Sequence, residues 1–193
     1  ATARLADNDR PISVGREQLG DGRWNFSGEI ADVVVTNAVL SGKPAGQPLK
    51  PETFDGKTTW RELPASKMGR TVSVAAWIKI AGADPVANYI VSKGEWNQAY
   101  SLGLSSGCLR WAINGTFVQT GKPLEKGRWL YVVGTYHEGA LRIFVNGSDV
   151  TPGDASGATH TGDVQVVERR FEKNVMTPAG AACAARVVNS GES

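Results

Sequence analysis

Asn-Gly pairs between short runs of β-forming residues constrain the fold of this chain more than any other feature. Asn114-Gly115 separates two such runs, and Asn146-Gly147 follows a third. A type I′ turn needs positive φ at both central residues, and Asn-Gly supplies it, so each pair predicts a β-hairpin. No long stretch shows convincing helical periodicity. Turn signals spaced by roughly 8–12 residues predict an antiparallel, all-β sandwich or barrel.

Length and charge exclude several classes of protein. The 193 residues fit one domain, because β-sandwiches and barrels run to about 200–250 residues as single domains. No apolar run approaches the roughly 20 residues of a membrane-spanning helix. Lys and Arg total 21 against 19 Asp and Glu, a net charge of +2. This balance gives no electrostatic case for nucleic acid or an anionic membrane surface, so we expect neither nucleic-acid binding nor membrane insertion.

Six short motifs follow one another between Phe54 and Val150. They are F-D-G at 54–56, S-V-A-A-W-I-K at 73–79, I-V-S-K-G at 90–94, Y-S-L-G-L at 100–104, G-R-W-L-Y-V-V-G-T-Y at 127–136 and L-R-I-F-V-N-G at 141–147. No single motif is specific, but in this order they resemble the bacterial laminin-G-like domains, which are related to pentraxins. The resemblance implies a concanavalin A-like jelly roll, an all-β sandwich of two antiparallel sheets.

The family's closing motifs resemble segments at the start of this chain, P-I-S-V-G-R at 11–16 and F-S-G-E-I-A-D-V-V-V at 26–35. The chain is either a circularly permuted sandwich or a piece of a tandem array. A sandwich without its closing strands would leave an unpaired edge and an uncovered core, which favours permutation. We therefore predict closing strands in 1–41, a linker in 42–51, the main sandwich in 52–163 and a C-terminal extension in 164–193.

Acidic residues give little support for catalysis. Some relatives of this fold are glucanases, and that chemistry needs two carboxylates across a cleft. The nearest match to the spacing E-x-D-x-x-E begins at Glu29, but Ala31 and Val34 stand at the other two acidic positions. Asp32 is three residues from Glu29, so the two side chains are expected on opposite faces of a strand. The sequence therefore predicts no catalytic residues.

Calcium is the predicted metal. It takes oxygen ligands, often carboxylates and backbone carbonyls of loops. The resemblance implies a site formed by an Asp of the closing strand and the backbone near F-D-G. Ala31 occupies the position of that Asp, so Asp32 and Asp55 are the candidate ligands.

The two cysteines, Cys108 and Cys183, lack zinc-ligand spacing. A single disulfide and two buried free thiols both fit the sequence. The cysteine count therefore does not fix the compartment. An extracytoplasmic location (secreted, periplasmic or cell surface) is expected.

Tryptophans in polar loops suggest a glycan-binding rim. Sugar rings pack on aromatic faces while their hydroxyls need nearby polar groups. If the permutation holds, the loops 21–25 and 94–98 can meet, although folding back over the sandwich end is the alternative for their tryptophans. The predicted ligand-binding residues are Trp24, Asn25, Trp96, Asn97, Gln98 and, as a further candidate, Trp60. Trp77 and Trp129 are expected to be structural, in core strands, and Trp111 to be half-buried.

Together these features predict a non-catalytic recognition module that resembles lectin-like and carbohydrate-binding domains. It would bind a glycan or a protein surface through loops at the sandwich rim. The alternative is a structural accessory subunit or scaffold domain of a larger extracytoplasmic assembly, docked through a flat sheet or through residues 164–193. A polysaccharide-active enzyme is the third hypothesis. The sequence does not specify the ligand or the oligomeric state.

Overall fold

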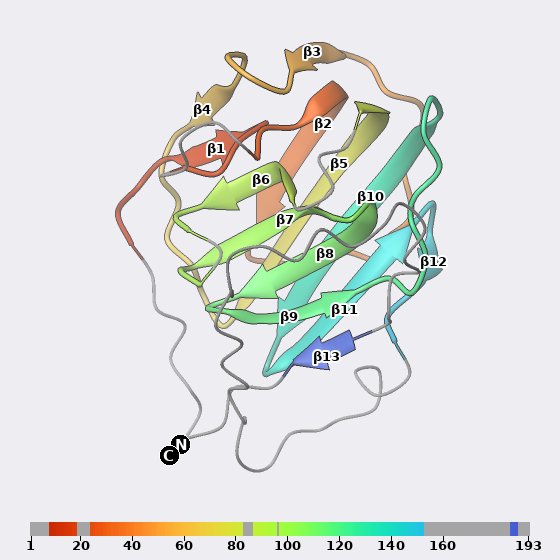
Figure 1. Ribbon diagram of the computed structural model, residues 1–193. Helices are drawn as coiled ribbons and strands as arrows, with labels where there is room; N and C mark the ends of the chain where they lie inside the picture. The colour runs from red at the N-terminus through yellow and green to blue at the C-terminus, as the bar shows by residue number, and fades with distance from the viewer. Residues whose placement is uncertain (1–7, 19–23, 83–86, 96, 153–185, 189–193) are drawn as a thin grey trace, which may run out of the picture.

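The computed structural model describes residues 8–18, 24–82, 87–95, 97–152 and 186–188. Within these ranges the chain forms strands in two antiparallel sheets that pack face to face (Figure 1). None of the described residues forms a helix long and apolar enough to cross a bilayer. The all-β jelly-roll sandwich predicted from the sequence is confirmed.

The first sheet has seven strands in the order β13-β9-β8-β7-β6-β1-β4. Their bounds are β1 Ile12–Val14, β4 Arg61–Leu63, β6 Asn88–Lys93, β7 Tyr100–Ser105, β8 Cys108–Ile113, β9 Thr116–Gln119 and β13 Arg186–Val188. The second sheet has six strands in the order β12-β11-β10-β5-β2-β3. Their bounds are β2 Ser27–Thr36, β3 Glu52–Asp55, β5 Thr71–Gly82, β10 Trp129–His137, β11 Ala140–Val145 and β12 Ser148–Asp149.

Two strands from the start of the chain complete both sheets. Figure 1 shows β1 and β2, in red and orange, between strands that come later in the sequence. β1 pairs with β4 and β6, with Ser13 opposite Ser92. β2 pairs with β3 and β5, with Ile30 opposite Ile78. The strand order is therefore permuted as the sequence predicts, and the closing strands lie in the same chain.

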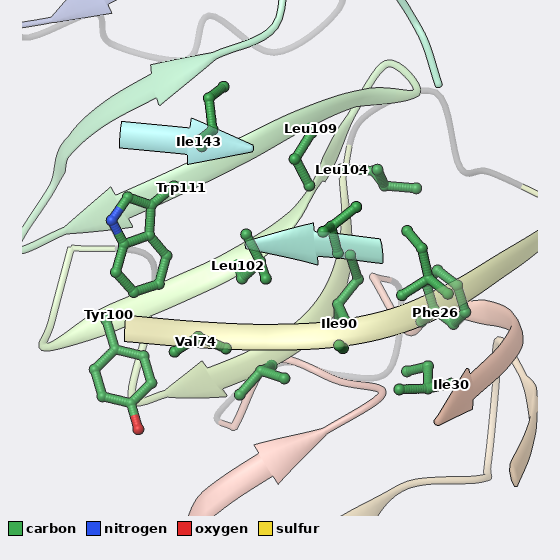
Figure 2. Packing of buried hydrophobic residues seen from close by; sticks show 14 of the residues in the cluster. Phe26, Ile30, Val74, Ile90, Tyr100, Leu102, Leu104, Leu109, Trp111 and Ile143 are labelled. Atoms are coloured by element: carbon green, nitrogen blue, oxygen red, sulfur yellow. The ribbon is translucent and has the colours of Figure 1, made fainter. Parts of the chain in front are cut away.

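The core lies between the sheets and is filled by alternating side chains from both (Figure 2). Trp111 on β8 is fully buried, which corrects the half-buried position predicted for it. Its indole Nε1 donates to the carbonyl of Thr135, at 3.0 Å. A Cβ at Gly134 would lie 2.4 Å from the Trp111 ring, so only glycine leaves room for the indole there.

Trp77 and Trp129 lie on the outer face of the six-stranded sheet and not in the sandwich core. Along β5, the core side chains are those of Ala76 and Ile78, and strand alternation turns Trp77 outward. Trp77 stands opposite Tyr131 in the ladder, with the two ring centroids 5.3 Å apart. Trp129 stands two pairs further along the ladder, opposite the outward-facing Lys79. The motifs that contain Trp77 and Trp129 form strands as predicted. Which face of the sheet each tryptophan occupies depends on the strand register.

The segment 37–51, which includes the linker predicted for 42–51, crosses the outer face of the six-stranded sheet. The amide of Leu40 donates to the Ser73 hydroxyl at 3.3 Å, and Gly42 packs against the Phe144 ring. The segment then returns to β2, where Leu49 donates its amide to the Asp32 carboxylate at 2.8 Å. We call residues 37–51 the strap. The strap closes much of this face, and outward-facing residues beneath its path, such as Ser73, are fully buried.

Candidate functional site

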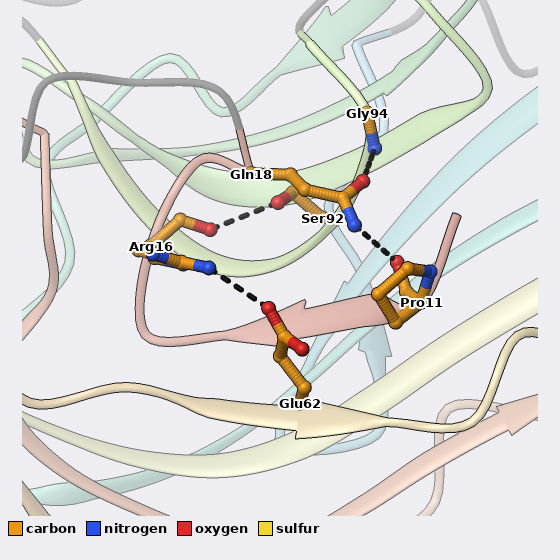
Figure 3. A network of polar contacts seen from close by, with 6 residues as sticks. All are labelled: Pro11, Arg16, Gln18, Glu62, Ser92 and Gly94. Atoms are coloured by element: carbon orange, nitrogen blue, oxygen red, sulfur yellow. Dashed lines mark hydrogen bonds and ion pairs between the residues drawn. The ribbon is translucent and has the colours of Figure 1, made fainter.

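Polar contacts hold the loop after β1 against the end of β6 (Figure 3). The side chain of Gln18 donates to the Pro11 carbonyl and accepts from the Gly94 amide, both at 2.8 Å. The Ser92 hydroxyl donates to the Arg16 carbonyl at 2.8 Å. The N-terminal segment therefore does reach the loop that begins at Gly94, as the permuted order requires.

The predicted rim is nevertheless not assembled as one surface. The carbonyl of Trp24 accepts from the Tyr89 amide at 3.0 Å, and Asn25 forms a β-bridge with Tyr89, at the beginning of β6. Asn97 and Gln98 follow the other end of β6. The two ends of this strand are about 16 Å apart, because a strand rises about 3.3 Å per residue. Trp96 lies outside the described residues. The described residues therefore do not bring Trp24 and Asn25 together with Asn97 and Gln98, because the first two contact the beginning of β6 and the other two follow its end.

The predicted rim residues differ in exposure. Asn25 is buried, and its Nδ2 donates to the Lys57 carbonyl at 2.7 Å, so it anchors the loop after β3. Gln98 is half-buried with its amide donated to Glu95, whereas Asn97 is exposed. Trp60 is 44% exposed and carries the Arg16 guanidinium over its ring, 4.1 Å from the centroid. Ligand binding by these residues stays a prediction.

The candidate calcium ligands are occupied by backbone donors and lie far apart. Asp55 accepts from the amides of residues 57, 58 and 59 and from the Thr58 hydroxyl. Asp32 has positive φ at a bulge in β2 and accepts from the Leu49 amide. Asp55 stands opposite Ser27, which is five residues, or about 16 Å, from Asp32 along the strand. The structure therefore does not join these two carboxylates in one calcium site, and the described residues hold no cluster of three metal-ligating side chains.

Replacing Asp55 with asparagine should lower the melting temperature at neutral pH. Hydrogen bonds from Thr58, Thr59 and Lys57 hold the pKa of Asp55 well below its ordinary value of 3.8. The carboxylate therefore stabilises the fold above pH 3.8, and this contribution is lost as the pH falls below that value. Thermal unfolding at several pH values should show the difference between Asp55→Asn and wild type shrink in acid. A Glu125→Gln variant serves as a control, and an unchanged melting temperature for Asp55→Asn at neutral pH would contradict the capping role.

A hollow lies on the outer face of the seven-stranded sheet. In the ladder, Tyr89 on β6 stands opposite Gly103 on β7, which stands opposite Arg110 on β8. Because Gly103 has no side chain, Tyr89 and Arg110 flank a gap of two strand spacings, about 10 Å. We call this the Gly103 hollow. Its lining includes Asn88, Tyr89, Ser101, Gly103, Arg110 and Ala112.

Close backbone approach explains the glycine beneath the hollow. A Cβ at Gly103 would lie 2.6 Å from the Asn88 carbonyl oxygen, where the β6–β7 pairing shifts register. The next pair of the same face, Ser101 opposite Ala112, is also small. The floor is therefore formed by small residues, and the polar groups stand on its walls.

The walls of the hollow combine a phenol and a guanidinium. Arg110 stacks on the Phe117 ring, with its Cζ 3.7 Å from the centroid. Burial lowers the pKa of Arg110, and no described carboxylate forms an ion pair with it. Burial also raises the pKa of Tyr89, and a hydrogen bond with the nearby Glu17 carboxylate raises it further. The arrangement can hold a polar ligand between an aromatic ring and a fixed cation.

Replacing Glu17 with glutamine should bring the pKa of Tyr89 part of the way back toward 10.0. The negative charge of Glu17 opposes ionisation of the phenol, while the burial that raises this pKa most remains in the variant. Ultraviolet titration of the tyrosines, with Tyr89→Phe to identify the signal, measures the change. Glu29→Gln, on the other sheet, should leave the titration as in wild type. A Tyr89 titration that is the same in Glu17→Gln and wild type would contradict the contact.

The hollow is not predicted by the sequence. The sequence pattern that corresponds to the hollow is an alternation of small residues, Ser101 and Gly103 on β7 and Ala112 on β8. Tyr89 and Arg110 lie beside these small residues. That pattern becomes visible only when the three strands are aligned in register. The register shift in β6, which brings Tyr89 opposite Gly103, has no sequence marker.

The acidic residues of β2 are engaged in contacts of their own. Glu29 forms an ion pair with Lys79 at 3.0 Å, and Asp32 holds the strap through Leu49. His137 shares a hydrogen bond with the Thr71 hydroxyl at 2.7 Å, while His160 lies outside the described residues. The absence of catalytic residues stays a prediction.

Comparison with known families agrees with this architecture. The family model Laminin_G_3, described as the concanavalin A-like lectin/glucanases superfamily, matches residues 55–174. Searches of curated proteins and of solved structures gave no match. The two sheets fit the jelly roll of this superfamily, and the match supports a lectin-like or other binding module in general. The chain therefore belongs to the Laminin_G_3 family of the concanavalin A-like superfamily.

Proposed function

We propose that this chain is a non-catalytic recognition module that binds a glycan in the Gly103 hollow. The observation that carries the proposal is the row formed by Tyr89, Gly103 and Arg110, an aromatic wall and a cation on either side of a floor of small residues. Such a site offers an apolar surface for a sugar ring and polar groups for its hydroxyls. The lectin-like family supports the same class of ligand.

The strap favours the seven-stranded sheet as the binding surface. On the other sheet, residues 37–51 cross the outer face, where they contact Ser73, Phe144 and Asp32. The outer face of β6, β7 and β8 instead carries the Gly103 hollow. This assignment moves the proposed ligand site from the rim loops to the face of a sheet.

A glycan microarray probed with the full chain tests the proposal. Ser101→Tyr places an aromatic ring in the hollow, whereas Thr53→Tyr adds the same ring to exposed β3 of the other sheet. We expect Ser101→Tyr to lose binding by at least about tenfold and Thr53→Tyr to bind like wild type, with thermal unfolding confirming that both fold.

Unchanged binding by Ser101→Tyr would contradict the assignment of the hollow. A wild-type chain that retains no glycan but co-purifies with a larger partner would favour the structural, accessory role. Binding should also persist in EDTA, because the hollow uses no metal. Loss of binding in EDTA would place the ligand at a calcium site instead.

The proposed module would act outside the cytoplasm. Cys108, fully buried at the start of β8, is disulfide-bonded, and Cys183 lies outside the described residues. Disulfides persist in oxidising compartments, which supports this location. Under denaturing conditions, a maleimide reagent should label neither cysteine before reduction and both after it. Labelling of both cysteines without reduction would contradict the proposal.

A further inference from the structure

The Gly103 hollow contains a polar group that the described part of the protein leaves unsatisfied. The Nε of Arg110 is buried and has no hydrogen-bond partner. A buried donor without a partner costs free energy, so a ligand that supplies an acceptor gains from it. Asn88 borders the hollow through its backbone, because it pairs with the core residue Leu104 and its side chain therefore faces away from Tyr89. The hollow thus offers one charged donor.

The Arg110 guanidinium is held in a fixed plane. It stacks on the Phe117 ring at 3.7 Å, and stacking uses the flat face of the group. Its N–H donors lie around the edge of that plane, where they match the two oxygens of a carboxylate. Arg110 is the one charged residue among those lining the hollow. A ligand with a single planar negative charge therefore fits better than a heavily sulfated chain.

We infer that the glycan bound in the Gly103 hollow carries a carboxylate, as in a uronic acid, which accepts from Arg110. The inference rests on the proposed function and names the ligand class of the same site. Tyr89 provides the aromatic wall beside the sugar. Glu17 is bonded to Tyr89 and does not line the hollow.

Pairs of glycans that differ only in the carboxyl group test the inference without any change to the protein. The probes are oligosaccharides of galacturonic, glucuronic and mannuronic acid, each beside its carboxyl-reduced counterpart, with a sulfated neutral oligosaccharide for comparison. We expect wild type to bind at least one acidic probe about 10–100-fold more tightly than its reduced form, the range of a charged hydrogen bond. Isothermal titration calorimetry gives the dissociation constants.

Variants of arginine separate the hollow from general charge attraction. Arg110→Gln should remove the preference for the acidic probe, and Arg110→Lys, which keeps the charge without the planar fork, should retain part of it. Arg142→Gln, on β11 of the other sheet, removes the same charge elsewhere and should bind like wild type. Circular dichroism and thermal unfolding establish that each variant folds.

Each contrary outcome has a distinct meaning. Equal affinity for acidic and reduced probes overturns the carboxylate inference and leaves glycan binding standing. Tighter binding of the sulfated probe also overturns the carboxylate inference, as does an equal loss of affinity in Arg142→Gln and Arg110→Gln. Either result would show general charge attraction and not recognition of a carboxylate by the planar guanidinium of Arg110. Failure to bind either member of any pair overturns the carboxylate inference, and only failure to bind every glycan of the microarray overturns the proposed function as well.

Discussion

Replacing Trp111 with alanine should lower the free energy of unfolding by about 3–5 kcal/mol, the range for large aromatic residues removed from a core. The indole is fully buried between the sheets, and Gly134 leaves space for its ring. The substitution also removes the hydrogen bond to the Thr135 carbonyl. Because small domains are stable by only about 5–15 kcal/mol, this loss approaches the whole stability of the domain. Urea denaturation followed by circular dichroism measures it.

Trp60→Ala is the matched control for Trp111→Ala. Trp60 is 44% exposed, and its described contact is the stacked Arg16 guanidinium. An exposed cation–π pair contributes about 0.5–1 kcal/mol, so Trp60→Ala should cost no more than that. Equal losses for the two variants would contradict the position of Trp111 in the core.

Replacing Ile30 with alanine should cost about 2–5 kcal/mol of unfolding free energy. Ile30 lies in the middle of β2, is 1% exposed and stands between Ile78 of β5 and Glu52 of β3. The loss is large because the side chain fills the core from a strand at the start of the chain. Val39→Ala, in the strap and 56% exposed, should change stability by less than about 0.5 kcal/mol. Chemical denaturation that finds Ile30→Ala as stable as Val39→Ala would show that β2 does not line the core.

Turn chemistry made the hairpins predictable. Asn114 and Gly115 both have positive φ, as do Asn146 and Gly147, so both predicted turns form with the backbone that Asn-Gly favours. The permuted strand order was also predictable, because an unpaired edge and an open core are costly anywhere in a sandwich. These features follow from local sequence or from general rules of packing.

The faces of the tryptophans could not be read from local sequence. Trp111 and Trp77 both occur in runs of β-forming residues. Trp111 fills the core, whereas Trp77 lies on the outer face of the six-stranded sheet, the face that the strap crosses. A shift of one residue exchanges the two faces of a strand, so the outcome depends on long-range register. The strap itself was expected only as a connection, since Gly and Pro indicate a turn-rich path without showing what it crosses.

The position of the candidate site depended on the same long-range geometry. The tryptophans in polar loops were visible in the sequence as candidates. In the fold, the Trp24 carbonyl accepts a hydrogen bond from the Tyr89 amide, which places Trp24 at the beginning of β6. Arg110 was not among the predicted ligand-binding residues, because a charged residue in a strand is usually an ordinary solvent-facing side chain. Its position over Phe117 and beside Gly103 follows from the alignment of β7, β8 and β9.

Cross-strand nuclear Overhauser effects between β2 and β5 test most directly whether the first strands complete the sandwich of their own chain. Ala31 lies opposite Trp77, and Val35 lies opposite Val74. We expect both contacts in uniformly labelled protein and neither in an isotope-filtered spectrum of mixed labelled and unlabelled chains. Their absence from the first spectrum, or their appearance in the filtered one, would show that β2 is detached or paired with a second molecule.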